Sequence, residues 1–173
     1  MEHAAVPSMS REQIMESWVS AYAGAILKTC FLCLADRELS QDAMQDTFIK
    51  AWKQLQKTDP AMIRNEKAWL LKIALNTCRD YRRSQWFRRV DMRKSLEDLP
   101  DSLMTAPESD RELTILIGSL PDKYKQVILL YYYSNLTYQE TAEALGIPKS
   151  TVNKRIKKAE ELLKRGLTGG DRA

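Results

Sequence analysis

Apolar residues recur every three to four positions along most of the chain, and this spacing constrains the fold more than any other feature of the sequence. Side chains at this spacing line one face of an α-helix. Alternation with a period of two is almost absent, since the one dense β-like run, 127–133, lies inside a longer helical period. The sequence therefore predicts an all-α fold. The clearest stripe is Ala43, Met44, Thr47, Phe48, Ala51, Trp52 and Leu55.

Capping residues and prolines predict where the helices begin and end. Ser10, with Gln13 three residues later, forms a capping box for the first helix. Ser40 is the expected N-cap of the second helix. Asp59 and Pro60 mark a loop over 58–65. The expected helices are about 10–35, 40–55, 66–83, 111–120, 121–131, 137–145 and 149–165, with Gly166 and the pair Gly169–Gly170 ending the last one.

The charged residues divide the chain of 173 residues, whose net charge is +4, into three blocks. Residues 1–95 hold 16 Lys and Arg against 11 Asp and Glu, residues 96–110 hold none against 5, and residues 111–173 hold 11 against 7. Two basic blocks therefore flank an acidic spacer, which suits a flexible linker. We expect two small helical domains joined by this linker. The expected division is a flexible tail 1–9, a domain 10–95, a flexible acidic linker 96–110, a second domain 111–167 and a tail 168–173.

The second domain carries a helix-turn-helix pattern. Thr137 and Glu140 form a capping box for its first helix, and Gly146 supplies the positive φ of the turn. The second helix has a polar, basic face that suits the major groove, where Asn and Lys side chains meet base edges and phosphates. A solvated Lys- and Arg-rich face is the alternative. The residues on this face are Ser150, Thr151, Asn153, Lys154, Lys157 and Lys158.

Two further helices have faces that suit macromolecular partners. The third helix places an aromatic residue, cations and an amide at spacings of 3, 4, 3 and 4, which suits single-stranded or partly opened DNA. A solvated cationic face, with Trp69 half-buried as packing, explains the same spacing. On the second helix, Ile49 beside Asp46 favours a protein contact, although an outer charged face is often only solvated. The third-helix residues are Trp69, Lys72, Asn76, Arg79 and Arg83, and those on the second helix are Asp42, Gln45, Asp46, Ile49 and Lys53.

Three runs in this order resemble segments of bacterial RNA polymerase sigma factors of the extracytoplasmic-function (ECF) type. Residues 42–52 resemble the polymerase-binding segment, and residues 68–76 resemble the segment that melts and reads the −10 promoter element. Residues 120–152 resemble the domain that reads the −35 element. One departure is Thr141, which stands where the family usually has an aliphatic residue.

The resemblance implies a function and a residue for each contact. It implies an initiation factor that binds core RNA polymerase, directs it to −35 and −10 promoter elements, and helps to melt the −10 region under the control of an anti-sigma factor. The implied polymerase contacts are Asp42, Gln45, Asp46 and Ile49. The implied −10 contacts are Trp69, Lys72, Asn76, Arg79 and Arg83, with Arg64 and Asn65 in the loop that cradles an extruded base. The implied −35 contacts are Ser150, Thr151, Asn153, Lys154, Arg155, Lys157 and Lys158.

Other functions are weighed against this one. A plain helix-turn-helix regulator would leave the 42–56 run unexplained, and a helical adaptor would bind no DNA. We expect no enzyme and no cofactor, because the sequence has no Gly-rich phosphate loop and its only histidine lies in the tail. Cys30 and Cys33, with Cys78, suggest a metal or redox site, but buried core cysteines explain them as well.

The location expected from the sequence is the cytoplasm, with recruitment to a membrane only through an anti-sigma factor. The longest nearly apolar stretch, Ala25–Ala35, is interrupted by Lys28 and is too short to span a bilayer. We therefore expect no stable membrane insertion.

Overall fold

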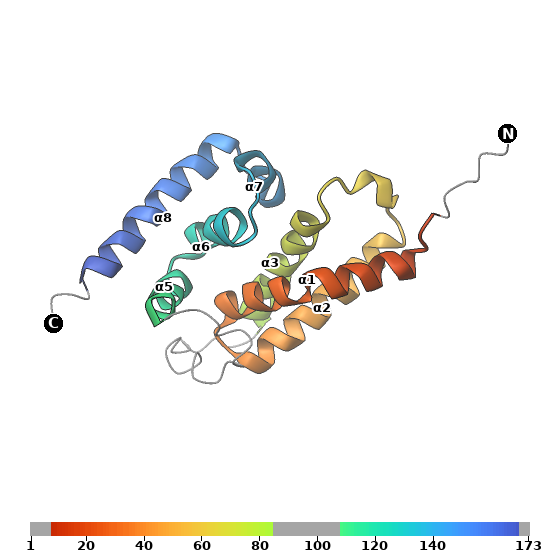
Figure 1. Ribbon diagram of the computed structural model, residues 1–173, viewed down its shortest axis with the longest axis horizontal. Helices are drawn as coiled ribbons and strands as arrows, with labels where there is room; N and C mark the ends of the chain where they lie inside the picture. The colour runs from red at the N-terminus through yellow and green to blue at the C-terminus, as the bar shows by residue number, and fades with distance from the viewer. Residues whose placement is uncertain (1–7, 85–107, 170–173) are drawn as a thin grey trace.

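The computed structural model describes residues 8–84 and 108–169, and every regular element in these two ranges is helical, which confirms the all-α fold (Figure 1). Residues 85–107 lie outside the described residues, and with them the end of the predicted first domain and most of the predicted linker. The elements are α1 (Arg11–Leu34), α2 (Arg37–Leu55), the 3₁₀ helix η1 (Pro60–Met62), α3 (Glu66–Ser84), α5 (Glu108–Gly118), α6 (Asp122–Ile128), the π-helix η3 (Leu129–Tyr133), α7 (Tyr138–Leu145) and α8 (Lys149–Gly169).

The capping box predicted for the first helix is confirmed. The Gln13 backbone N–H donates to Ser10 Oγ at 3.2 Å, and the Ser10 backbone N–H donates to Gln13 Oε1 at 2.9 Å. Two of the N–H groups that a helix start leaves without a partner are thereby satisfied. The helix ends at Ala35, which adopts the left-handed conformation with φ 53°.

The second helix begins one turn earlier than predicted, and Ser40 is not its cap. Asp36 caps α2, because its Oδ1 accepts a hydrogen bond of 2.8 Å from the Leu39 backbone N–H. Ser40 instead lies fully buried inside the first turn, and its hydroxyl donates to the Asp36 carbonyl. Asp and Ser are equally good caps. The earlier one prevails here because starting the helix at Arg37 extends it by a full turn.

Helices α1, α2 and α3 form a three-helix bundle whose core includes Trp18, Ile26, Leu55, Leu70 and Leu71. By length and composition alone, α1 is long and apolar enough to cross a membrane. The core helix of a globular domain meets the same criteria, and α1 packs against both α2 and α3.

The second domain contains the predicted helix-turn-helix in α7 and α8. The Glu140 backbone N–H donates to Thr137 Oγ1 at 3.1 Å, and the Thr137 backbone N–H donates to Glu140 Oε2 at 2.7 Å, which confirms the predicted capping box. Gly146 adopts φ 65°, which confirms the predicted turn. Val152 and Ile156 of α8 are buried against the rest of this domain.

Two predicted boundaries in the second domain are wrong. Helix α5 already begins at Glu108, so the end of the predicted linker 96–110 is helical. Helix α8 runs through Gly166 to Gly169, past its predicted end near Arg165 and into the first two residues of the predicted tail. Gly166 acts as a packing residue, because a Cβ atom there would lie 2.6 Å from Leu116 Cδ2 of α5. The missing side chain allows the two helices to approach.

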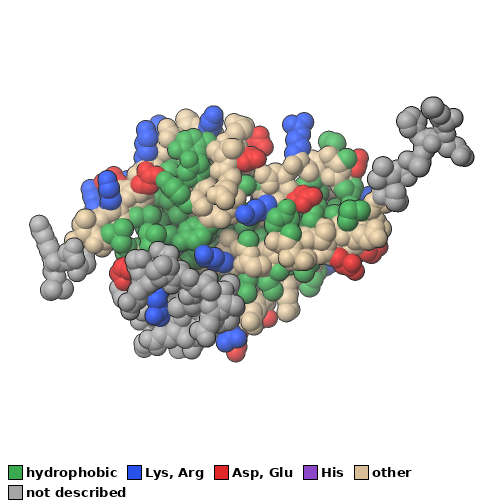
Figure 2. All heavy atoms as spheres, viewed as in Figure 1, with side chains coloured by type: hydrophobic (Ala, Val, Ile, Leu, Met, Phe, Trp, Pro, Cys, Tyr) green, Lys and Arg blue, Asp and Glu red, His purple; other side chains and the backbone are tan. Residues whose placement is uncertain are grey.

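The two domains share one hydrophobic core. Ile117, Leu120, Leu129 and Leu136 of the second domain belong to the same buried cluster as the bundle residues. On the face drawn in Figure 2, hydrophobic side chains gather around α6, between α8 and the bundle. Polar contacts cross the same junction: Arg82 pairs with Asp122, and Lys28 Nζ lies 4.7 Å from the centre of the Tyr133 ring.

Candidate polymerase and nucleic-acid interfaces

The α3 basic face consists of Trp69, Lys72, Asn76, Arg79 and Arg83, and α3 brings all five to one side. Lys72, Asn76, Arg79 and Arg83 are exposed, whereas Trp69 is half-buried and meets Trp18 edge-on with ring centres 5.6 Å apart. Arg79 donates to Asn76 Oδ1. The packing explanation therefore holds for the inner part of Trp69, and the polar members of the face point to solvent.

The loop before α3 carries the two remaining −10 candidates. Asn65 caps α3, because its Oδ1 accepts a hydrogen bond of 2.9 Å from the Ala68 backbone N–H. Asp59 caps the 3₁₀ turn η1 in the same way, through a bond of 3.0 Å from the Ala61 N–H. These caps give the loop a defined shape and leave Arg64 exposed beside Asn65.

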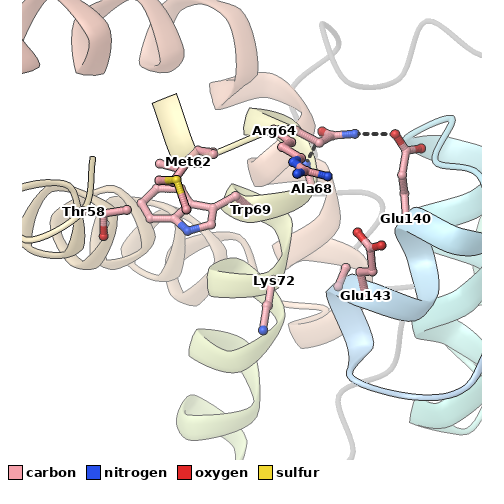
Figure 3. Close-up of a pocket in the computed structure, with 11 residues that line it drawn as sticks. Thr58, Met62, Arg64, Ala68, Trp69, Lys72, Glu140 and Glu143 are labelled. Carbon is pink, nitrogen blue, oxygen red and sulfur yellow. Dashed lines mark hydrogen bonds between the residues drawn. The ribbon is translucent and has the colours of Figure 1, made fainter. Parts of the chain in front are cut away.

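A pocket of about 330 Å³ lies between this loop and α7 (Figure 3). We call it the interdomain pocket, because both domains contribute to it. Sequence reasoning missed the α7 contribution, since no spacing rule relates positions so far apart in the chain. The lining residues are Thr58, Met62, Ile63, Arg64, Asn65, Ala68, Trp69, Lys72, Glu140, Glu143 and Ala144.

A hydrogen bond joins the two domains across this pocket. Asn65 Nδ2 donates to Glu140 Oε1 at 3.0 Å, which is the dashed line that reaches Glu140 in Figure 3. The Glu140 carboxylate also accepts from the Thr137 backbone N–H, and these contacts hold the pKa of Glu140 below its usual value. The charged form of Glu140 is therefore the one that both contacts stabilise.

The α2 outer face consists of Asp42, Gln45, Asp46 and Ile49, and the structure brings all four to the surface of α2. Asp42 and Gln45 are exposed, and Ile49 is 51% exposed, which is unusual for a large apolar side chain in a helix. Asp46 is half-buried, and its Oδ2 accepts a hydrogen bond of 2.5 Å from the Tyr81 hydroxyl of α3.

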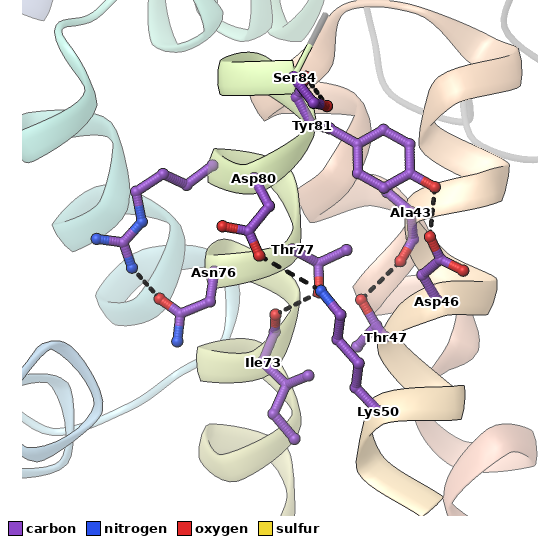
Figure 4. A network of polar contacts seen from close by, with 11 residues as sticks. Ala43, Asp46, Thr47, Lys50, Ile73, Asn76, Thr77, Asp80, Tyr81 and Ser84 are labelled. Atoms are coloured by element: carbon purple, nitrogen blue, oxygen red, sulfur yellow. Dashed lines mark hydrogen bonds and ion pairs between the residues drawn. The ribbon is translucent and has the colours of Figure 1, made fainter. Parts of the chain in front are cut away.

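A polar network continues from this contact along the seam between α2 and α3 (Figure 4). Lys50 Nζ lies 3.2 Å from Thr77 Oγ1 and 3.5 Å from Asp80 Oδ2. The Thr77 hydroxyl itself donates to the Ile73 carbonyl at 2.8 Å. The network holds the α2 outer face in a fixed position relative to the α3 basic face.

The α8 basic face consists of Ser150, Thr151, Asn153, Lys154, Arg155, Lys157 and Lys158. Ser150, Lys154 and Lys157 are exposed, and the other four are partly exposed. The opposite face, with Val152, Ile156 and Ala159, is buried. The first turn of α8 contains no acidic residue. The arrangement presents a row of cations and hydrogen-bonding groups with no carboxylate at its leading end.

Thr141, the departure noted in α7, is fully buried. Its Oγ1 is the one buried side-chain oxygen or nitrogen without a hydrogen-bond partner in the described part of the chain. An aliphatic residue would fill the same position without a polar group to satisfy.

Cys30, Cys33 and Cys78 are free and buried together in the bundle. A hydrogen bond with Cys78 and burial raise the pKa of the Cys33 thiol. Such thiols are poor nucleophiles, so the structure favours the core interpretation. Within residues 8–84 and 108–169, no group of His, Cys, Asp and Glu is arranged to hold a metal ion.

Comparison with known proteins supplies the family. Residues 18–88 match the family described as Sigma-70 region 2, and residues 110–163 match Sigma-70, region 4. The ECF RNA polymerase sigma-E factor of Haemophilus influenzae is 30% identical over 139 residues, covering 70% of this chain and 71% of that protein. The chain belongs to the ECF sigma factors. Membership of this family excludes the plain regulator, which leaves the 42–56 run unexplained, and the helical adaptor, which has no role on DNA.

Other similar proteins cover the sigma factor almost from end to end. The ECF sigma factor SigW of Bacillus subtilis is 28% identical over 163 residues, or 86% of each chain. The solved structure of CnrH in complex with the cytosolic domain of CnrY has a TM-score of 0.70 and 26% identity, and it covers 91% of this chain and 90% of that one. The sigma factor RpoE of Bartonella quintana, solved with the anti-sigma factor NepR, shares the fold with a TM-score of 0.71 and 18% identity.

Proposed function

We propose that this sigma factor binds core RNA polymerase, directs it to −35 and −10 promoter elements, and helps to open the −10 region. The observation that carries the proposal is the presence, in one ECF chain, of two separate basic faces that point to solvent, one on α3 and one on α8. A factor of this kind performs no catalysis of its own and needs no cofactor.

The α2 outer face is the proposed contact with polymerase. It combines two carboxylates and an amide with the exposed side chain of Ile49. Exposed apolar surface bordered by polar groups is typical of protein interfaces. A groove between α1 and α2 is lined by Glu12, Met15, Glu16, Val19, Ser20 and Trp52, and Trp52 follows Ile49 by about one helical turn.

The α3 basic face and the preceding loop are the proposed −10 site. Lys72, Arg79 and Arg83 supply cations for the phosphate backbone, which gives affinity but no sequence preference. Asn76 and Asn65 supply amides for the edges of unpaired bases, and the exposed part of Trp69, with Arg64, borders the pocket where a base is held. Extruding a base costs a few kcal/mol, which contacts of this kind offset.

The α8 basic face is the proposed −35 site. Ser150, Thr151 and Asn153 lie in the first turns, where a recognition helix meets base edges. Lys154, Arg155, Lys157 and Lys158 follow, where phosphates approach. Neither site alone binds strongly in this proposal, and polymerase holds both at a fixed spacing, so that two weak contacts act as one strong contact.

An anti-sigma factor is the proposed inhibitor, because the similar sigma factor RpoE was solved with the anti-sigma factor NepR, and CnrH was also solved with a protein partner, the cytosolic domain of CnrY. Such an inhibitor would cover the apolar surface that polymerase uses. We also propose that the sigma factor acts in the cytoplasm, where polymerase and promoter DNA are found, and reaches a membrane only through that partner.

Transcription in vitro with purified core polymerase on a promoter library tests the proposal. We expect transcripts from a defined set of promoters only when the sigma factor is added. Asp42→Arg is expected to lower affinity for core polymerase, whereas the matched charge reversal Glu112→Arg, at an exposed position of α5 outside all three proposed interfaces, leaves core binding intact. The absence of a stable complex with core polymerase would overturn the proposal.

A further inference from the structure

The last two lysines of the α8 basic face differ in their surroundings. Lys158 Nζ lies 3.2 Å from Glu161 Oε2, and this contact, with the charge of Arg165, holds the pKa of Glu161 below its usual value. Lys157 is exposed and makes no hydrogen bond or ion pair within the described part of the chain. The charge of Lys158 is therefore partly neutralised by its own helix, whereas Lys157 retains its full charge.

Spacing alone would give Lys157 a carboxylate partner as well. Glu160 stands three residues after Lys157 and four residues before Lys164. At the same two spacings Glu161 contacts a lysine at 3.2 Å and an arginine at 2.5 Å. Charged side chains three and four residues apart are neighbours on a helix surface and form such pairs. The free state of Lys157 therefore requires that Glu160 be held elsewhere.

A tyrosine from outside α8 holds Glu160. The Tyr132 hydroxyl, in the π-helix η3, donates a hydrogen bond to Glu160 Oε1. This bond, followed by burial, raises the pKa of Tyr132 to about 12, so the hydroxyl is a donor at neutral pH. The Tyr131 ring meets the Tyr132 ring edge-on with centres 4.9 Å apart, and it packs at 4.8 Å on the ring of Tyr138. These aromatic contacts order Tyr132 although it lies at the surface.

Lys157 lies where a free cation is useful for DNA binding. Ser150, Lys154 and Lys157 follow one another at spacings of 4 and 3, and all three are exposed, so they form one row along α8. In the proposed −35 site this row runs from the base edges toward the phosphates. Glu160 comes three residues later. A carboxylate that turned back toward Lys157 would neutralise it and repel the approaching phosphate.

We propose that Tyr132 is a positioning residue for the −35 contact, which holds the Glu160 carboxylate and thereby keeps Lys157 available to a DNA phosphate. This inference rests on the proposed function of the α8 basic face and ranks two of its cations. Lys157 contributes more to DNA affinity than Lys158, because the ion pair of Lys158 must break before that lysine can contact a phosphate.

The test is the affinity of the full-length chain for a fluorescein-labelled DNA duplex of mixed sequence, measured by anisotropy at several salt concentrations. Such a duplex reports phosphate contacts, which carry no base preference. Tyr132→Phe releases Glu160 without changing the ring. We expect affinity to fall about two- to fivefold, the range of an exposed ion pair. The slope of log K against log salt should become shallower by about 0.9, which corresponds to one phosphate contact.

A double-mutant cycle separates this effect from a general loss of structure. Lys157→Gln removes the cation itself, so adding Tyr132→Phe to that variant should cause no further loss. Glu160→Gln removes the carboxylate, so adding it to Tyr132→Phe should restore the wild-type affinity and salt slope. A further loss in the first case, or no restoration in the second, would overturn the positioning role.

The matched control is Tyr22→Phe, which removes another bond from a tyrosine to a glutamate. The Tyr22 hydroxyl donates to Glu66 Oε2 at 3.1 Å, and no Lys or Arg stands three or four residues from Glu66. The released Glu66 therefore neutralises no cation at helical spacing, and duplex affinity should stay at the wild-type value. An equal loss in the Tyr22→Phe and Tyr132→Phe variants would count against the inference.

The same measurements distinguish the inference from the function on which it rests. If Lys154→Gln and Lys157→Gln both leave duplex affinity and its salt slope unchanged, the α8 basic face does not bind the duplex, and the proposed −35 contact fails together with the positioning role. If either lysine variant binds more weakly while Tyr132→Phe has no effect, only the positioning role fails.

Discussion

The Tyr81 hydroxyl of α3 donates a hydrogen bond of 2.5 Å to Asp46 Oδ2 of α2. Burial, followed by this bond to a carboxylate, raises the pKa of Tyr81, so the hydroxyl remains a donor throughout the physiological pH range. Asp46 therefore has two roles in the proposed mechanism. One carboxylate oxygen joins the two helices, and the other remains available at the α2 outer face.

Tyr81→Phe removes this bond without changing the ring. We expect the free energy of unfolding to fall by about 1 kcal/mol, as for a hydrogen bond to a partly exposed carboxylate. Urea denaturation measures the change. The control is Tyr132→Phe, which removes a bond to Glu160 from a side chain that is 51% exposed. That change should lower the free energy of unfolding by less. An equal loss in the two variants would show that the Tyr81–Asp46 bond stabilises the protein no more than an exposed bond does.

Thr141→Val replaces the unpaired buried hydroxyl of α7 with a methyl group of similar size. Burying a hydroxyl without a partner costs about 1–3 kcal/mol, so we expect the variant to be more stable by roughly 1 kcal/mol. Thermal unfolding followed by circular dichroism checks this. Thr47→Val is the control, because the Thr47 hydroxyl donates to the Ala43 carbonyl at 2.7 Å and its loss should give no gain. A less stable Thr141→Val protein would contradict the prediction.

Glu140 makes the free energy of unfolding depend on pH in the acidic range. Its contacts with Thr137 and Asn65 lower its pKa from the ordinary value of 4.5. A lowered pKa in the folded state means that the contribution of Glu140 is fully present above about pH 4.5 and is lost as the pH falls through the lowered value. We expect the difference in unfolding free energy between wild type and Glu140→Gln to be constant near neutral pH and to shrink below pH 4.5. A difference that grows in acid would contradict this sign.

Asn76→Ala tests the α3 basic face. We expect discrimination among −10 sequences to fall by about 1–2 kcal/mol, comparable to the loss of one base contact, while binding to core polymerase is unchanged. Competitive transcription from paired promoters measures the first quantity, and native gel electrophoresis with core polymerase measures the second. The opposite pattern, weaker core binding with unchanged base preference, would reassign Asn76 to the polymerase interface.

Local signals predicted most of the fold. Both capping boxes, at Ser10 and Thr137, were predicted from four-residue patterns, because such contacts depend only on residues close in the chain. The errors arose where two local solutions compete. Asp36 and Ser40 are both good caps, and the longer helix that starts after Asp36 places Ser40 inside its first turn, where it is buried. Gly166 predicted a helix end, but contact with Leu116 gives it a place inside α8.

The candidate surfaces were predictable only within single helices. Periodicity brings Lys72, Asn76 and Arg79 to one side of α3, and the structure places them there. The bond between Asn65 and Glu140 joins positions separated by 75 residues, and no repeat or cap in the sequence relates them. Contacts of this kind depend on how two preformed units fit together, which is a property of shape rather than of spacing.

The single core shared by the two domains limits how this protein can open. Ile117, Leu120 and Leu136 are shielded from water in part by the other domain's cluster. Separating the domains would expose this apolar junction to water, at a free-energy cost of roughly 25 cal/mol for each Å² of apolar surface uncovered. A partner that binds the two domains when they are separated must therefore supply apolar side chains to cover the exposed junction, and charged groups for its edge.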